Sequence, residues 1–373
     1  MIRVLHLIDG SCTETAFQIL ALLIRSLSTE AYDHIIASTD GTILRRAEPF
    51  LPTRPIRAES RGLAGLIVSP RLMKMEEWAG PQIIHAWGLD AARSAGGRLR
   101  ERPLLLTCLS PGRARDGAAV LRALPDQVAV AAGSQVIRSR LATAGVDPGR
   151  IVVIRGPADL AAINAARSAG LRRRIVGTAG PVILLDGPAS REGGQYYGLW
   201  AAAIVAQVHK GLRVLLPYES SETERLQRFL RQIRLPELLV RPDRSLTWSQ
   251  LAACADVFLC PATEEVCTDP LAAAMGGGLA VVGSAVRSVA EIIADRHNGL
   301  LAKPADPRAL AGKLLTAIED VELCRRLSEV ARGQAYEVFG VRAFADNYAR
   351  LYANMIDGRE CGLGVVDTAM LPA

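Results

Sequence analysis

The strongest constraint on the fold is a regular alternation between short apolar runs and longer helical segments. In the first 150 residues each apolar run is four to six residues long and is bounded by proline, glycine or charged residues. Short buried strands that alternate with helices are typical of a parallel sheet with helices on both faces. The pattern predicts strands at residues 3–8, 34–38, 82–86, 104–107 and 127–131, and helices at residues 15–27, 63–78 and 134–144.

A second series of the same kind begins at Pro181. It predicts strands at residues 182–185, 213–216, 239–240, 257–260 and 279–282, and helices at residues 196–209, 222–233, 249–253 and 270–275. Residues 160–180 are polar and basic, which favours a linker. Because 373 residues exceed one ordinary core, we predict two domains. The expected fold is α/β with two doubly wound, Rossmann-like domains at residues 1–175 and 176–340, then a helix at 341–357 and a flexible tail at 358–373.

The seven cysteines are odd in number and scattered, and none forms a C-x-x-C pair with a second half elsewhere. This pattern indicates neither a zinc site nor a disulfide framework, so we expect free thiols in a reducing cytoplasm. The apolar run in residues 1–9 is too short for a secretory signal, and no long uncharged apolar stretch follows. We therefore expect a cytoplasmic protein with no bound metal.

The formal net charge of +6 comes largely from dispersed arginines. Two denser groups occur at residues 98–102 and 172–174, but no aromatic residues are interleaved with them, which argues against nucleic-acid binding. Solvated helix faces are the simplest interpretation. Peripheral contact with an anionic inner-membrane face is the second, since each basic residue near such a surface contributes about 1 kcal/mol.

Several segments carry a further signal through their order along the chain. Residues 81–88 read P-Q-I-I-H-A-W-G, residues 253–262 read A-C-A-D-V-F-L-C-P-A, and residues 297–301 read H-N-G-L-L. In this order they resemble the GT-B-fold retaining glycosyltransferases of family four, also called glycosyl transferases group 1, from residue 2 to about residue 356. The resemblance implies two Rossmann-like domains whose parallel sheets face each other across a cleft, with an acceptor-side domain first and a donor domain second.

The segment at residues 263–275 is similar to the nucleotide-sugar loop of that family, which has two glutamates eight positions apart. Glu265 stands at the first position and Ala273 at the second. The resemblance implies a catalytic or donor-binding role for Glu265 and a donor-site position for Glu291. It also assigns donor contacts to Gly10, Gly187, Thr268 and Asp269. Arg191 is a further donor-binding candidate, because it lies close in sequence to the positions of the family's basic pair. A catalytic role for His85 is predicted instead from its place at the carboxyl end of a predicted strand, where such sheets bind ligands.

Several positions depart from the family pattern. The basic pair that would hold the donor diphosphate is replaced by Pro188 and Gly193, although Arg191 lies close to them in sequence. The histidine after the strand near residue 107 aligns with Leu109. Losing both cations and the second carboxylate would forfeit about 4–9 kcal/mol if the contributions were additive. These active-site motifs are degenerate, so activity itself is in question.

Each candidate also has a structural interpretation. Glu265 could complement the dipole of the helix that follows it, and Glu291 is favourable at a helix start for the same reason. A lone histidine beside a buried strand, as His85 is, often serves packing. Arg155 and Arg191 are phosphate candidates by elimination.

The leading hypothesis is a glycosyltransferase that moves a sugar from a nucleotide-diphosphate sugar to a carbohydrate or lipid-linked acceptor with retention of configuration. It requires no cofactor beyond that donor substrate, and no nucleic acid. The alternative is a catalytically inactive homologue that acts as a binding or assembly subunit, beside a partner glycosyltransferase. An epimerase or other sugar-nucleotide enzyme on the same fold is a third, weaker hypothesis.

Overall fold

The computed structural model describes residues 1–10, 12, 14–38, 40–52, 56–57, 59–60, 66–67, 80–95, 102–109, 128–158, 160–168, 170–177, 179–186, 191–217, 222–243 and 246–361. The chain forms two compact units. Unit 1 combines Met1–Pro157 with Val341–Ala373, and unit 2 is Ala158–Gly340. Residues 158–175, which the sequence assigned to the first domain, therefore group with unit 2, and the C-terminal helix groups with unit 1.

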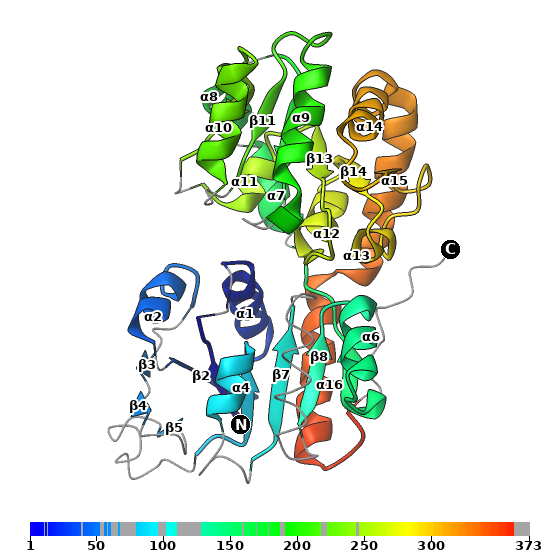
Figure 1. Ribbon diagram of the computed structural model, residues 1–373. Helices are drawn as coiled ribbons and strands as arrows, with labels where there is room; N and C mark the ends of the chain where they lie inside the picture. Colours follow the sequence, from blue (N-terminus) through cyan, green and yellow to red (C-terminus); the bar gives the residue numbers. More distant parts are fainter. Residues whose placement is uncertain are drawn as a thin grey trace. The chain divides into compact units, whose positions relative to one another are not determined.

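Unit 1 is built on a parallel sheet with the strand order β3-β2-β1-β6-β7-β8-β9 (Figure 1). The five predicted strands are present, and β3 and β9 extend the sheet at its two edges. A separate antiparallel pair joins β4 and β5. The strands are β1 (Ile2–Leu7), β2 (Tyr32–Ser38), β3 (Ile56–Arg57), β4 (Glu59–Ser60), β5 (Leu66–Ile67), β6 (Ile83–Ala86), β7 (Leu104–Cys108), β8 (Ala129–Ala132) and β9 (Ile151–Val153).

The helices of unit 1 cover this sheet. Ser134 begins α6 by accepting a hydrogen bond from the Ile137 amide, as expected of an N-cap serine. The last helix, α16, buries Phe344, Tyr348 and Tyr352 in the same core as α1, which explains why the chain returns to unit 1 at its end. The predicted helix at residues 63–78 lies outside the described residues. The described helices are α1 (Glu14–Ser26), α2 (Gly41–Ala47), α4 (Leu89–Ser94), α6 (Gln135–Thr143) and α16 (Val341–Ile356).

Unit 2 contains a second parallel sheet, with the order β12-β11-β10-β13-β14-β15. Its predicted strands are present, and β15, which was not predicted, adds an edge strand beside β14. Central strands β10 and β13 are buried on both faces, as a doubly wound sheet requires. The strands are β10 (Val182–Leu185), β11 (Arg213–Leu215), β12 (Leu239–Val240), β13 (Val257–Cys260), β14 (Ala280–Ser284) and β15 (Leu300–Ala302).

The linker predicted at residues 160–180 is wrong, because the structure has two helices there. Arg172 on α8 donates to the Asp256 carboxylate at 2.7 Å and so ties this basic segment to the body of unit 2. The described helices are α7 (Leu160–Ser168), α8 (Leu171–Val176), α9 (Gln195–Val205), α10 (Thr223–Gln232), α11 (Trp248–Ala252), α12 (Asp269–Gly276), α13 (Arg287–Ala290), α14 (Pro307–Glu319) and α15 (Val321–Val338).

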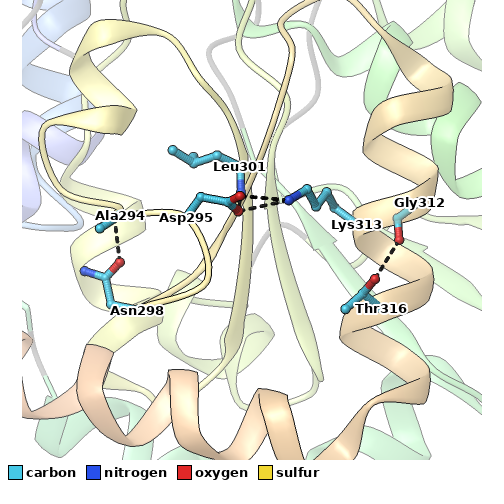
Figure 2. A network of polar contacts seen from close by, with 7 residues as sticks. All are labelled: Ala294, Asp295, Asn298, Leu301, Gly312, Lys313 and Thr316. Atoms are coloured by element: carbon cyan, nitrogen blue, oxygen red, sulfur yellow. Dashed lines mark hydrogen bonds and ion pairs between the residues drawn. The ribbon is translucent and has the colours of Figure 1, made fainter.

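A polar network fastens the loop between α13 and β15 (Figure 2). The Asp295 carboxylate accepts from the Leu301 amide at 2.7 Å and from the Lys313 ammonium of α14 at 3.0 Å. Burial opposes ionisation of Asp295, but these two donors outweigh it and lower its pKa. Asn298 accepts from the Ala294 amide at 2.8 Å and donates to the Ile292 carbonyl at 2.9 Å. The loop is therefore an integral part of unit 2.

Candidate functional site

The strand order of unit 2 reverses between β10 and β13. From β10 the chain continues to β11 and β12 on one side, and from β13 it continues to β14 and β15 on the other. Loops that leave such neighbouring strands diverge at the carboxyl ends, and open α/β sheets bind ligands in the resulting crevice. The two loops here follow Leu185 and Cys260. They contain most of the donor-binding residues that the sequence predicts.

A hollow of about 330 Å³ lies between these two loops. The residues that line it combine one cation, two carboxylates, a phenol and a hydroxyl; they are Arg191, Glu192, Tyr197, Thr263, Glu264 and Ala305. The carboxylates and hydroxyls suit the recognition of a polyhydroxyl compound, and Arg191 suits an anionic group. Of the predicted site residues that the structure describes, Arg191 alone lines this unit 2 hollow.

Backbone contacts fix the back of the unit 2 hollow. The Thr263 amide donates to the Glu192 carbonyl at 2.8 Å, and the Thr263 hydroxyl lies 3.3 Å from the same carbonyl. The short helix η4 (Arg191–Gly193) is followed by Gly194, whose φ is +67°. A Cβ on Gly194 would lie 1.9 Å from the Pro261 carbonyl oxygen. Glycine is therefore required for the two loops to approach this closely.

Glu265 lies next to this hollow and makes a local contact. Its Oε2 accepts from the Ser288 amide at 2.6 Å, and the Ser288 hydroxyl accepts in return from the Val266 amide at 3.1 Å. The reciprocal pair ties the loop after β13 to the start of α13. Glu265 thus satisfies an amide at the start of α13, whereas its structural interpretation placed it at the start of the following helix, α12; its side chain remains partly exposed. The geometry is compatible with both of its predicted roles.

Thr268 and Asp269 begin α12 and are buried. The Cys267 thiol donates to Asp269 Oδ2 at 3.0 Å. Burial, with the Asp269 carboxylate nearby, raises the pKa of Cys267 well above its ordinary value, so the thiol keeps its proton. The structure places both residues inside the helix start and not on the lining of the hollow.

The remaining predicted donor residues are dispersed. Glu291 ends α13 and is half-exposed, and Gly187 lies outside the described residues. Tyr197, Glu192 and Thr263 line the hollow but were not predicted. The one available signal for Tyr197 was its place in the first turn of the helix that follows the Gly193-Gly194 pair.

Unit 1 has its own reversal point, between β1 and β6. Gly10 follows β1 there and is exposed, with open space around it. The neighbouring Asp9 is buried, and its Oδ2 accepts from the Ala91 amide in α4 at 2.8 Å. A carboxylate of the chain itself therefore occupies the start of α4, where an anionic ligand would otherwise be favoured.

His85 lies inside the core of unit 1. Its Nδ1 is 2.7 Å from the Tyr352 hydroxyl, and its Nε2 is 2.7 Å from the Thr107 hydroxyl, which in turn is 3.0 Å from the Tyr348 hydroxyl. The imidazole is fully buried, and burial lowers its pKa well below 6.5. This geometry gives no support to a catalytic role for His85, because both ring nitrogens already contact residues of the core. It supports the packing interpretation.

Two further histidines, His6 and His34, form a series of hydrogen bonds in which each donor can be assigned. The Trp87 indole donates to His6 Nδ1 at 3.1 Å, and His6 Nε2 lies 3.0 Å from His34 Nδ1. An indole N–H can only donate, so His6 carries its proton on Nε2 and donates it to His34. His34 must then carry its proton on Nε2, which has no hydrogen-bond partner among the described residues. If His6 took up a second proton, its Nδ1–H would face the Trp87 indole N–H, and two donors would then lie against each other.

Acidification is therefore expected to destabilise unit 1. Burial lowers the pKa of His34 from 6.5 to about 4, although Asp33 opposes the shift. Because the unfolded chain takes up protons first, the contribution of His34 to the free energy of unfolding should be constant above pH 6.5 and fall between pH 6.5 and about 4. We expect a loss of about 1 kcal/mol from His34 by about pH 5, after discounting for its partial exposure.

Urea unfolding across this pH range measures the effect. In His34→Gln the amide oxygen can still accept from His6 but does not titrate, so the pH slope should decrease. An unchanged slope would show that His34 does not bind protons on unfolding.

Two findings limit the chemistry of the described residues. All seven cysteines are free thiols, as predicted. In the part of the chain that the structure describes, no three His, Cys, Asp or Glu side chains gather in a way that could hold a metal ion. No described helix is both long and apolar enough to cross a bilayer.

Comparison with known sequences gives a match in unit 2. Residues 244–334 match the sequence model of the family described as glycosyl transferases group 1. A curated protein, N-acetyl-alpha-D-glucosaminyl L-malate synthase of Bacillus anthracis, is 23% identical over 155 residues. The match covers 42% of this chain and 40% of that protein, so the chain spans less than half the length of this relative.

Comparison with solved structures covers nearly the whole chain. HepE of Anabaena, in complex with UDP and glucose, is similar with a TM-score of 0.75 at 18% identity, over 94% of this chain and 98% of that chain. Sucrose-phosphate synthase of Thermosynechococcus elongatus has a TM-score of 0.73 at 16% identity, over 96% and 100% of the two chains. These likenesses confirm the predicted GT-B fold. With the family match, they confirm the resemblance to group 1 glycosyltransferases.

Proposed function

We propose that this chain, a GT-B-fold protein related to the glycosyl transferases of group 1, transfers a sugar from a nucleotide-diphosphate sugar to a carbohydrate or lipid-linked acceptor with retention of configuration. The observation that carries the proposal is the unit 2 hollow, which lies at the reversal point between β10 and β13 and beside Glu265. HepE, which resembles this chain in fold, was solved with UDP and glucose.

The chemistry of each side chain suggests its role in binding the donor. The half-exposed Glu265 carboxylate accepts hydrogen bonds from sugar hydroxyls, while its contact with the Ser288 amide holds it in place. The guanidinium of Arg191 donates charge-assisted hydrogen bonds to a phosphate. Tyr197 offers a ring to the apolar face of a sugar or base. In this proposal Gly187 and Glu291 supply further donor contacts, and Gly10 in unit 1 leaves room for a ligand at the end of β1.

The alternative, a catalytically inactive binding or assembly subunit beside a partner glycosyltransferase, rests on one observation. Among the described residues that line the hollow, two carboxylates, Glu192 and Glu264, stand beside one cation, Arg191. A diphosphate carries several negative charges, which this lining neutralises only in part. A chain that binds a sugar but not a nucleotide would fit this alternative.

We further propose that the protein acts in the cytoplasm and touches the inner face of an anionic membrane. The seven free thiols suit a reducing compartment. A lipid-linked acceptor would be presented at that membrane face.

Calorimetric titration with nucleoside diphosphates and their sugars tests the proposal. Glu265→Ala is expected to weaken binding of the matching nucleotide sugar about tenfold, the value of one hydrogen bond to a charged group. Glu265→Gln separates the two roles, because its amide oxygen still accepts from Ser288 but carries no charge. Glu237→Ala, an exposed acid after α10, serves as the control.

The outcomes discriminate between the hypotheses. Binding with product formation supports the transferase, and sugar binding without nucleotide binding supports the inactive homologue. If the wild type binds neither class of ligand at millimolar concentration, the proposed donor site is wrong.

A further inference from the structure

The side of unit 2 formed by α9 and α10 exposes large apolar side chains. Trp200 on α9 is 42% exposed, Val208 just beyond α9 is 66% exposed, and Ile233 at the end of α10 is 39% exposed. Most large apolar side chains of unit 2 are buried, and the exposed ones form two groups among the described residues, these three and Val321, Val330 and Tyr336 on α15. The first group lies on two neighbouring elements that are also joined by aromatic contacts. Neither the hollow nor Glu265 involves these residues.

Trp200 is held in place by its neighbours. Its ring lies 6.0 Å from that of Tyr196 and 6.4 Å from that of Phe229 on α10, measured between centroids. The Arg225 guanidinium lies 4.9 Å above the Tyr196 ring. These contacts join α9 to α10, which also lie side by side in Figure 1. The exposed indole ring of Trp200 therefore packs against the rings of Tyr196 and Phe229.

Val208 and Ile233 lie at one edge of the sheet. Val208 is in the connection from α9 to β11, and Ile233 is in the connection from α10 to β12. Since β11 and β12 pair in parallel, both connections reach the sheet at its amino edge. The unit 2 hollow is at the opposite, carboxyl edge. A surface bound at the amino edge would leave the hollow open.

The same elements carry positive charge. Arg228, Arg231 and Arg234 are exposed at three-residue spacing, and Arg231 and Arg234 flank Ile233. Among the described residues none of these three arginines takes part in an ion pair, whereas Arg225 pairs with Glu222 at 2.9 Å. The end of α10 thus combines cations that make no ion pair among the described residues with the exposed Ile233, close to the elements that expose Trp200 and Val208.

We propose that this α9–α10 face, defined by Trp200, Val208, Ile233, Arg228, Arg231 and Arg234, binds the anionic surface of a membrane. Basic and apolar side chains that share one exposed surface are typical of segments that lie in the lipid interface. The aliphatic side chains of Val208 and Ile233 favour a membrane over an acidic polysaccharide as the ligand of this face. They can insert among lipid acyl chains, but they cannot form hydrogen bonds with sugars or stack on sugar rings. The inference assigns a surface to the membrane contact proposed above.

Vesicle co-sedimentation with the full chain tests this assignment. The protein should bind vesicles of phosphatidylcholine mixed with phosphatidylglycerol, bind phosphatidylcholine alone weakly, and dissociate as salt rises. The triple variant R228Q/R231Q/R234Q should lose affinity about a hundredfold, because each basic residue near an anionic surface contributes about fivefold. The matched control is R308Q/R326Q/R332Q, which removes three exposed arginines from α14 and α15.

Apolar insertion has its own readout. Binding should shift the tryptophan emission to shorter wavelength, and Trp200→Phe should abolish the shift without abolishing binding. Trp200→Ser combined with Ile233→Ser should weaken binding even where the arginines are intact.

Each contrary outcome overturns the proposal. These outcomes are no binding by the wild type at low salt, an equal loss in the control triple variant, or equal binding to a soluble polyanion such as polyglutamate. Calorimetry of nucleotide sugars with the same variants should show unchanged affinity. Failure of the membrane assignment is thereby distinguished from failure of the proposed transferase.

Discussion

Replacing His85 by alanine is expected to lower the free energy of unfolding by about 3–5 kcal/mol. The substitution removes a fully buried ring and leaves a cavity among Trp87, Tyr348 and Tyr352, whose rings all lie close to it. It also leaves the hydroxyls of Tyr352 and Thr107 without their shared partner. Urea unfolding followed by circular dichroism measures the loss.

Two variants isolate the cause. Tyr352→Phe removes one hydrogen bond and no ring, so it should cost about 1–2 kcal/mol. His297→Ala, at an exposed position in unit 2, should change stability by less than about 0.5 kcal/mol. If His85→Ala left stability intact but abolished sugar transfer, His85 would be a catalytic residue, and the packing assignment would be wrong.

The sequence predicts the two sheets well because their central strands are unusually uniform. Strands such as Val182–Leu185 and Val257–Cys260 are continuous apolar runs, as expected of strands in a parallel sheet that is covered on both faces. The predicted linker failed for the opposite reason. Helices α7 and α8 are short and α8 is basic. Helix α8 is held by the contact between Arg172 and Asp256, which are far apart in the chain.

The candidate site was predictable only in outline. Its location follows from the order of the strands, and Glu265 follows from the resemblance. The role of each single side chain depends on partners that are distant in the sequence. His85 becomes a core residue because α16 returns from more than 250 positions along the chain, with the Tyr352 contact spanning 267 positions. Similarly, the contact between Glu265 and Ser288 depends on how α13 packs, which no local pattern encodes.

Gly194 gives the second large effect, and it concerns the shape of the unit 2 hollow. Gly194→Ala is expected to lower the free energy of unfolding by about 2–4 kcal/mol. Alanine is strained at a φ of +67°, and its Cβ would collide with the Pro261 carbonyl. Relief of the collision must move η4 away from the loop after β13, and so separate Arg191 and Glu192 from Thr263.

The matched control is Gly312→Ala in the middle of α14. A Cβ at Gly312 meets nothing within 4 Å, so alanine should stabilise this helix by about 0.5–1 kcal/mol. Gly194→Ala should also weaken any ligand that binds in the hollow, whereas Gly312→Ala should leave its affinity unchanged. Thermal unfolding and calorimetry of the two variants measure both effects. A Gly194→Ala protein with wild-type stability and wild-type affinity would mean that the two loops do not approach each other as described, and the hollow would then have to be placed elsewhere in unit 2.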